Sequence, residues 1–247
     1  MAQPVHFKAT VTDVINHDVN IRSYALYSDK RLPRFLPGQF IHLSLDNYDP
    51  SGFWPESRVF SVANFVSDNH TIKLLIGRQG YYTNRILDEL QQGSIVSCKG
   101  PYGDFTIKDD IVSGRKIILI AGGTGITAFS GFFENLMQQE AACFSLCHLL
   151  YGVKNDNLLV YKSLTDTCLH RHPGFKVTYF AENRNNGSLS SDIVNGRINI
   201  KPICEDISFS SDTLFYLSGP KMMIDHFTDE LKNKYSLDAK NIMIDAW

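Results

Sequence analysis

The sequence predicts two domains, an N-terminal antiparallel β-barrel over residues 1–110 and then an α/β domain with a parallel sheet over residues 111–247. Short segments rich in Val, Ile, Thr, Phe and Tyr, separated by turn residues, fill the first part and are typical of strands. From about residue 115 the pattern changes to apolar run, glycine loop and helical segment. The length of 247 residues suits two domains of ~100–150 residues each.

In the first domain, partial alternation of apolar and polar residues predicts five strands. Their ranges are 6–15, 22–28, 39–45, 58–65 and 71–77. One helix is predicted over residues 82–93, where Ile86 and Leu90 share a face and Gly93 stands at a stop position. Several short strands with one helix are typical of a closed or nearly closed antiparallel barrel.

In the second domain, strands and helices alternate. The apolar run at residues 116–123 predicts a strand that is buried on both faces. Further strands are predicted at 141–153, 175–182, 211–219 and 241–247, and helices at 125–140, 157–171 and 220–235. This alternation predicts right-handed βαβ units, with a parallel sheet covered by helices on both faces.

Composition and charge exclude several functional classes. The 24 basic and 26 acidic residues give a net charge of −2, so nucleic acid is not an expected partner. No apolar stretch reaches the ~18–20 residues of a membrane span. The five cysteines show no paired CxxC spacing, and we expect neither a metal site nor an iron–sulfur cluster. The N-terminal residues do not resemble a secretory leader, and we expect a location in the cytoplasm.

Two glycine loops follow strands of the second domain and open helices. The first is Gly122-Gly123-Thr124-Gly125, where glycines allow close backbone approach and helix-start amides attract anions. This context suits a dinucleotide pyrophosphate, although the loop matches neither GxGxxG nor GxxxxGK[ST]. The second loop, residues 217–220, follows another strand, and we expect both loops to line one crevice. Glycine turns that serve packing alone are the alternative for both.

The barrel carries a third candidate, the segment Arg58-Val59-Phe60-Ser61. Strand alternation places Arg58 and Phe60 on one face, and Val59 and Ser61 on the other. A guanidinium can pair with a phosphate, an aromatic ring can lie against a planar ring, and a hydroxyl can bond a heteroatom. The alternative is a half-buried strand with an exposed arginine and a core phenylalanine.

Together, five segments in this order and spacing resemble the ferredoxin–NADP reductase superfamily, over nearly the whole chain. The segments are Arg58–Ser61 for the family's RxYS motif, Gly80–Thr83 for GxxS/T, Gly100–Phe105 for GPxGxF, Ile120–Ile126 for GGTGI, and Leu217–Met223 for C/S-G-P-x-x-M. The resemblance implies FAD bound by the barrel and NADPH or NADH bound as cosubstrate by the second domain.

The resemblance also implies roles for individual residues. Arg58 would hold the flavin pyrophosphate, Phe60 would pack on the isoalloxazine, and Ser61 would bond the flavin near N5. The implied cofactor-binding residues are Arg58, Val59, Phe60, Ser61, Gly80, Tyr81, Tyr82, Thr83, Gly123, Thr124, Gly125, Arg184, Gly219, Pro220 and Trp247. The implied catalytic residues are Ser61, Thr124 and Ser218.

Some positions depart from the family pattern. Phe60 replaces the usual tyrosine, Thr127 stands where the glycine loop usually continues with proline, and Ser218 stands where some members carry cysteine. Trp247 could cover the flavin or pack on the last strand. Asp245 lies where relatives carry an acidic residue beside the flavin, and a surface carboxylate is the alternative.

We therefore expect an NAD(P)H-dependent flavoprotein reductase. It would pass a hydride from NAD(P)H to FAD, and then electrons to a separate acceptor such as a ferredoxin- or flavodoxin-like carrier or an oxygenase component. One alternative is a flavin or ferric reductase that uses free flavin. Another is an FAD-binding subunit that bridges electrons without its own nicotinamide turnover.

The choice of coenzyme depends on residues after the strand at 175–182. Glu182 could bond a ribose 2′-hydroxyl and favour NADH, whereas Arg184, assisted by Lys154, could pair with a 2′-phosphate and favour NADPH. Of the two, we expect NADPH. The basic segment 28–34 could dock an acidic carrier, and a solvated loop is the alternative.

Overall fold

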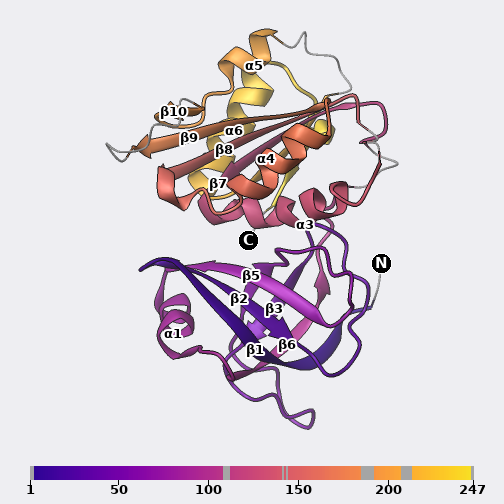
Figure 1. Ribbon diagram of the computed structural model, residues 1–247, viewed down its shortest axis with the longest axis vertical. Helices are drawn as coiled ribbons and strands as arrows, with labels where there is room; N and C mark the ends of the chain where they lie inside the picture. The colour runs from indigo at the N-terminus through magenta and orange to yellow at the C-terminus, as the bar shows by residue number, and fades with distance from the viewer. Residues whose placement is uncertain are drawn as a thin grey trace. The chain divides into compact units, whose positions relative to one another are not determined.

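The computed structural model describes residues 3–107, 112–140, 142, 144–184, 192–206 and 213–245 (Figure 1). Contacts divide the chain into two compact units. The first unit is Met1–Thr106 with Thr127–Glu134, and the second is Ile107–Ile126 with Asn135–Trp247. The domain boundary expected after residue 110 stays a prediction.

The first unit is a nearly closed antiparallel barrel of six strands in the order β4-β3-β6-β1-β2-β5. The strands are β1 (Val5–Asp18), β2 (Ile21–Tyr27), β3 (Phe40–Ser44), β4 (Arg58–Ser61), β5 (Thr71–Gly77) and β6 (Ile95–Tyr102). Alternate side chains point inward, as on β5, where Ile72, Leu74 and Ile76 are buried in the barrel core. The sequence-based assignment lacked β6.

One helix of the barrel, α1 (Tyr81–Glu89), lies between β5 and β6. Ile86 and Leu87 are buried, and they attach the helix to the barrel core. The helix ends at Glu89, because Leu90 is already extended, rather than at the predicted Gly93. Gly93 has a φ of +87° and forms a turn before β6.

The second unit contains a parallel sheet in the order β10-β9-β8-β7-β11-β12. The strands are β7 (Lys116–Gly122), β8 (Leu146–Asn155), β9 (Phe175–Asn183), β10 (Ile193–Asn195), β11 (Leu214–Ser218) and β12 (Ile242–Ile244). All pairings between neighbouring strands are parallel. The central strand β7 is buried along residues 117–121, as its continuous apolar sequence predicts.

Helices α4 (Lys162–Arg171) and α6 (Lys221–Asn233) lie on opposite faces of the sheet. The other helical segments after β7 are η1 (Gly123–Ile126), α3 (Thr127–Leu136), η2 (Asp156–Leu158), α5 (Lys201–Asp206) and η3 (Ala239–Asn241), and residues Thr127–Glu134 of α3 belong to the first unit. Adjacent residues of β9 point to opposite faces: Tyr179 contacts α4, whereas Phe180 packs in the core cluster that includes α6. Figure 1 shows α4 in front of the sheet and α6 behind it.

Several predicted boundaries were wrong. Strand β8 begins at Leu146 rather than residue 141, and α4 begins at Lys162 because a 3₁₀ turn precedes it. Pro220 lies just before α6 instead of in its first turn. Strand β10 and helix α5 were not predicted from the sequence. Within the described ranges, no helix is both long and apolar enough to cross a membrane.

Two glycines of the barrel differ in a way that predicts different tolerance to substitution. Gly38 has a φ of +93°, and a Cβ there would lie 2.0 Å from the carbonyl oxygen of Phe105, whereas a Cβ at Gly93, φ +87°, would meet no atom within 4 Å. We expect Gly93→Ala to cost about 1–2 kcal/mol for the left-handed conformation alone, and Gly38→Ala to cost more because the backbone must also move. Chemical denaturation followed by circular dichroism would compare the variants. Equal losses would refute the steric argument.

A histidine in the second sheet predicts loss of stability in acid. His148 on β8 lies with Nε2 2.9 Å from the Thr178 hydroxyl, and burial, with help from Lys176, lowers its pKa from 6.5 to about 4. Its contribution to stability is complete above pH 6.5 and is lost as the pH falls toward 4, because the unfolded state then binds the proton more readily.

The variant His148→Gln removes this titration. We expect its unfolding free energy to fall less steeply between pH 6.5 and 4 than that of the wild type, by at most about 1.4 kcal/mol per pH unit. Denaturant titrations at a series of pH values would measure the difference. Identical slopes for the two proteins would contradict the assignment.

Candidate functional site

In the barrel, Arg58 lies beside the first turn of α1. Its guanidinium carbon is 4.8 Å from the centroid of the Tyr82 ring, and Nη2 is 3.0 Å from Oε1 of Glu56. Tyr82 is buried, and its hydroxyl donates to the Glu56 carbonyl and accepts from the Leu45 amide. These two bonds tie the helix start to the segment between β3 and β4, so Arg58 at the start of β4 is held next to that helix start.

The first turn of α1 presents backbone donors. The hydroxyl of Thr83 accepts from the amides of Gln79 and Gly80 at 2.8 and 3.1 Å, which closes the turn before the helix. The first amides of the helix, from Tyr81 onward, have no acceptor within the helix. An added Cβ at Gly80 would meet no atom within 4 Å, so the backbone is open to a ligand on that side. Unpaired amides beside a guanidinium are suited to a diphosphate.

The remaining residues of β4 divide between the two faces of the sheet as alternation predicts. Phe60 pairs with Ile41 and packs, partly buried, against the barrel core. On the other face Ser61 pairs with Phe40, whose ring lies 5.7 Å from that of Tyr102. The face of β4 that carries Ser61 therefore adjoins the aromatic rings of Phe40 and Tyr102.

Two further residues extend this aromatic surface. Val59 pairs with His42, whose ring meets that of Tyr102 edge-on at 5.2 Å. Burial and the positive charge of Lys99 lower the pKa of His42. We therefore expect the His42 side chain to be uncharged at pH 7.

The second unit contains a cleft of about 700 Å³ at the carboxyl ends of its parallel strands. Residues from both glycine loops, from the ends of β8 and β9, from the segment after β10 and from α6 line it. They are Gly122, Gly123, Gly152, Val153, Lys154, Glu182, Gly196, Arg197, Ile198, Pro220, Met222, Met223, His226 and Phe227. In open parallel sheets, ligands bind at this edge.

The two glycine loops meet in this cleft, because β7 and β11 are neighbours. A Cβ at Gly125 would lie 2.5 Å from the carbonyl carbon of Ser218 and 2.6 Å from the amide of Gly219. Gly219 has a φ of +147°, and a Cβ there would lie 2.9 Å from the amide of Gly122. Side chains at these positions would force the loops apart. Thr124 belongs to η1 in the first loop, and it is not among the residues that line the cleft.

A buried polar pair supports the second loop. The hydroxyl of Ser218 donates to Oδ2 of Asp245 at 2.8 Å, and the amide of Asp245 donates to the carbonyl of Leu217. Both side chains are buried. Asp245 is therefore not the surface carboxylate that the sequence left open, and it holds the Ser218 hydroxyl in one orientation.

The lining of the cleft includes charged side chains that sequence reasoning identified only in part. Glu182 and Lys154 line it as expected, whereas Arg184 is not among its lining residues. Arg197 and His226 also line it, although neither was predicted as a site residue from the sequence. The Asn195-Gly196 pair, a turn signal directly before Arg197, was the available clue. Trp247, which the sequence suggests as a cofactor-binding residue, lies outside the described residues.

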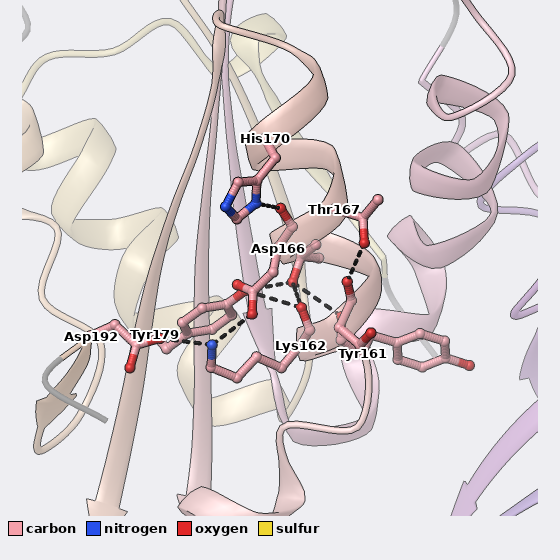
Figure 2. Close-up of polar contacts among 9 residues, drawn as sticks. Tyr161, Lys162, Asp166, Thr167, His170, Tyr179 and Asp192 are labelled. Atoms are coloured by element: carbon pink, nitrogen blue, oxygen red, sulfur yellow. Dashed lines mark hydrogen bonds and ion pairs between the residues drawn. The ribbon is translucent and has the colours of Figure 1, made fainter. Parts of the chain in front are cut away.

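A separate polar cluster lies between α4 and β9 (Figure 2). Lys162 binds Asp166 and Asp192, each with an N–O distance of 2.7 Å. Tyr179 donates to Asp166 at 2.6 Å, and burial together with this carboxylate raises the pKa of Tyr179. These groups satisfy one another, and the cluster fastens α4 to the sheet.

Comparison with known proteins assigns both parts of the chain. Residues 6–107 match the family model of the oxidoreductase FAD-binding domain, and residues 119–229 match that of the oxidoreductase NAD-binding domain. The first match covers the barrel, and the second covers the glycine loops and the cleft.

Among curated proteins, the chain is 26% identical over 192 residues to the toluate 1,2-dioxygenase electron transfer component of Pseudomonas putida, covering 77% of this chain and 52% of that protein. It is 27% identical over 178 residues to the phenol 2-monooxygenase reductase component DmpP of Pseudomonas sp. strain CF600, covering 71% of this chain and 47% of the relative. The chain thus spans about half the length of these relatives.

Among solved structures, the cytochrome P450 reductase GcoB of Amycolatopsis superposes with a TM-score of 0.80 at 24% identity, covering 98% of this chain and 69% of that one. This similarity concerns the fold. With an FAD-binding barrel followed by an NAD-binding parallel-sheet domain, the chain belongs to the ferredoxin–NADP reductase superfamily.

Proposed function

We propose that this chain is the reductase of an electron-transfer system, which oxidises NAD(P)H and passes the electrons through FAD to a separate acceptor. The observation that carries the proposal is that each matched domain contains a site suited to its own nucleotide. The barrel offers Arg58 beside open helix-start amides, and the second domain offers the cleft between its glycine loops. Bound FAD supplies the hydride and electron chemistry, and the protein supplies binding and orientation.

The residues of the barrel have distinct tasks in this proposal. The Arg58 guanidinium would pair with the charged pyrophosphate of FAD, and the amides of Tyr81 and Tyr82 would donate hydrogen bonds to it. Phe60 offers a ring face to the isoalloxazine, without the hydroxyl of the usual tyrosine. The Ser61 hydroxyl, on the opposite face of β4 from Phe60, donates or accepts a hydrogen bond at the flavin edge.

The residues of the second domain hold the nicotinamide nucleotide. Gly123 and Gly125 let the backbone approach it, as glycine-rich loops do for phosphates. Thr124 and Ser218 provide hydroxyls from the two adjoining loops, and Asp245 keeps the Ser218 hydroxyl in a fixed orientation. Gly219 and Pro220 shape the end of the cleft beside Gly122.

The proposed acceptor is an oxygenase component or its electron carrier. The relatives from Pseudomonas are described as electron transfer and reductase components of oxygenases, which supports an oxygenase component or its carrier as acceptor. A location in the cytoplasm, expected from the sequence, belongs to this proposal as well.

Anaerobic rapid mixing of the purified yellow protein with NADPH or NADH tests the proposal. We expect the visible absorbance of the flavin to bleach with at least one coenzyme, and the reduced protein to reoxidise when a ferredoxin, a flavodoxin or an oxygenase component is added. Absence of bleaching with both coenzymes would support a bridging subunit instead. Reoxidation by free flavin or ferric complexes alone would support a flavin or ferric reductase.

The role of Arg58 has its own test. We expect Arg58→Ala to weaken FAD binding by roughly 10- to 100-fold, because it removes hydrogen bonds between a guanidinium and a charged pyrophosphate. Titration of the apoprotein with FAD, followed by flavin fluorescence, measures the dissociation constant.

Arg78→Ala is the matched control for Arg58→Ala. Arg78 binds Asp88 in the last turn of α1, at the opposite end of the helix from the proposed pyrophosphate site. Its removal should leave FAD affinity nearly unchanged. Equal FAD affinity of the Arg58→Ala and wild-type proteins would refute the role assigned to Arg58.

A further inference from the structure

Helix α3 follows a loop of the second unit but packs with the first. Its first residue, Thr127, comes directly after the glycine loop in η1, yet Thr127–Glu134 belong to the first unit together with the barrel. There α3 contacts the segment Val62–Phe65, which continues the chain of β4 beyond Ser61. Ser61 is the residue proposed above to bond the flavin edge, so a role for α3 in flavin chemistry rests on that proposed function.

The segment Val62–Phe65 is irregular backbone that lies largely inside the protein. Val62, Ala63 and Asn64 are buried, so their polar groups need partners within the protein. The amide of Ala63 donates to the carbonyl of Lys73 at 2.8 Å, and the side-chain oxygen of Asn64 accepts from the Lys73 amide at 2.7 Å. On one side, the segment is therefore bound to β5.

One face of α3 supplies partners on the other side. The hydroxyl of the buried Ser130 donates to the carbonyl of Ala63 at 2.7 Å. Oε2 of Glu134 accepts from the amide of Phe65 at 2.8 Å. Because Ser130 and Glu134 are four residues apart, they lie on the same face of the helix. The segment after β4 is thus held between β5 and α3.

Packing fixes the helix in the position that these two hydrogen bonds require. A Cβ at Gly131 would lie 3.0 Å from the carbonyl oxygen of Asn64, so the helix backbone and the segment are in close contact. On a neighbouring part of α3, the ring of Phe129 lies 5.8 Å from that of Phe105. The donor and the acceptor on α3 therefore act from a fixed support.

We propose that Ser130 and Glu134 are positioning residues for flavin reduction, which hold the end of β4 and thereby set the place of the Ser61 hydroxyl. A carboxylate that accepts from a backbone amide makes a charge-assisted bond, stronger than a neutral one. Without Glu134 the amide of Phe65 loses this acceptor, and the segment can shift. Reaction rates depend steeply on the placement of reacting groups. The shift should therefore slow flavin reduction more than it weakens FAD binding, to which Arg58 contributes.

Three variants separate the loss of a bond from the loss of a charge. Glu134→Ala removes the acceptor, Glu134→Gln keeps an oxygen for the Phe65 amide, and Ser130→Ala removes the donor to Ala63. Stopped-flow mixing of the FAD-loaded protein with saturating NADPH or NADH measures the limiting rate of flavin reduction. We expect both alanine variants to lower this rate about tenfold, and Glu134→Gln to keep at least about half of it. The dissociation constant for FAD should change by less than about threefold.

Two readouts do not depend on turnover. In hydrogen–deuterium exchange of the full chain as purified, peptides over residues 62–66 should exchange faster in Glu134→Ala than in the wild type or Glu134→Gln. The visible absorption spectrum of the bound flavin should shift in Glu134→Ala and return toward that of the wild type in Glu134→Gln. The matched control is Glu205→Ala, which removes a helix carboxylate 3.7 Å from the exposed Lys201 on α5. It should change none of these quantities.

The outcomes separate the positioning role from the function on which it rests. If the wild type is not reduced by either coenzyme, the proposed function fails and the positioning role fails with it. If the wild type is reduced and Glu134→Ala is reduced equally fast, only the positioning role is overturned, whatever the exchange data show. An equal fall in rate for Glu134→Gln and Glu134→Ala would also overturn it, because the acceptor would then not be the cause. If Glu134→Ala does not fold, the rate of Ser130→Ala decides by the same criterion.

Discussion

The nucleotide cleft depends on one steric constraint, the direct contact of two backbone loops at the carboxyl edge of the parallel sheet. Gly125 approaches the Ser218–Gly219 peptide so closely that a single Cβ would overlap it. Because β7 and β11 are adjacent, the loops that follow them leave the sheet side by side, and only glycine lets them touch. The 3₁₀ turn η1 and the start of α6 are thereby brought to the same place. Gly122, Gly123 and Pro220 of these two loops line the cleft.

In the barrel, a buried tyrosine and not a loop contact brings the groups of the candidate site together. Its pyrophosphate candidate consists of a guanidinium from an edge strand and amides from a helix that begins more than twenty residues later. The buried Tyr82 joins them, because its hydroxyl bonds to backbone groups on both sides of the segment between β3 and β4. Tyr82 is therefore a positioning residue, and Arg58 is the group that the ligand would meet. Both sites combine open backbone donors with a few fixed charges, a general pattern for nucleotide binding.

The role assigned to a charged residue of the cleft depends on the side chain that lies next to it. Glu182 alone at the end of a strand suggests recognition of a ribose hydroxyl. Arg197 beside it changes this interpretation, since its Nε lies 3.3 Å from Oε1 of Glu182 and both side chains line the cleft. Only the pair defines the electrostatic character of the site.

The sequence alone determined the two-part architecture, the glycine loops, the Arg58–Ser61 strand and the helix start at Gly80–Thr83. Each of these is a local pattern, in which side-chain period or glycine at a strand end reflects backbone geometry over a few residues. Strand β6 was missed because Gly100 and Pro101 are typical of turns; Gly100 is instead required by the close approach of Ile41 on β3, a contact with a distant segment. Arg197 and the burial of Asp245 were likewise decided by tertiary structure. Both depend on which strands become neighbours in the sheet. The Asn195-Gly196 pair predicts a turn before Arg197, but it does not predict which part of the fold that turn meets.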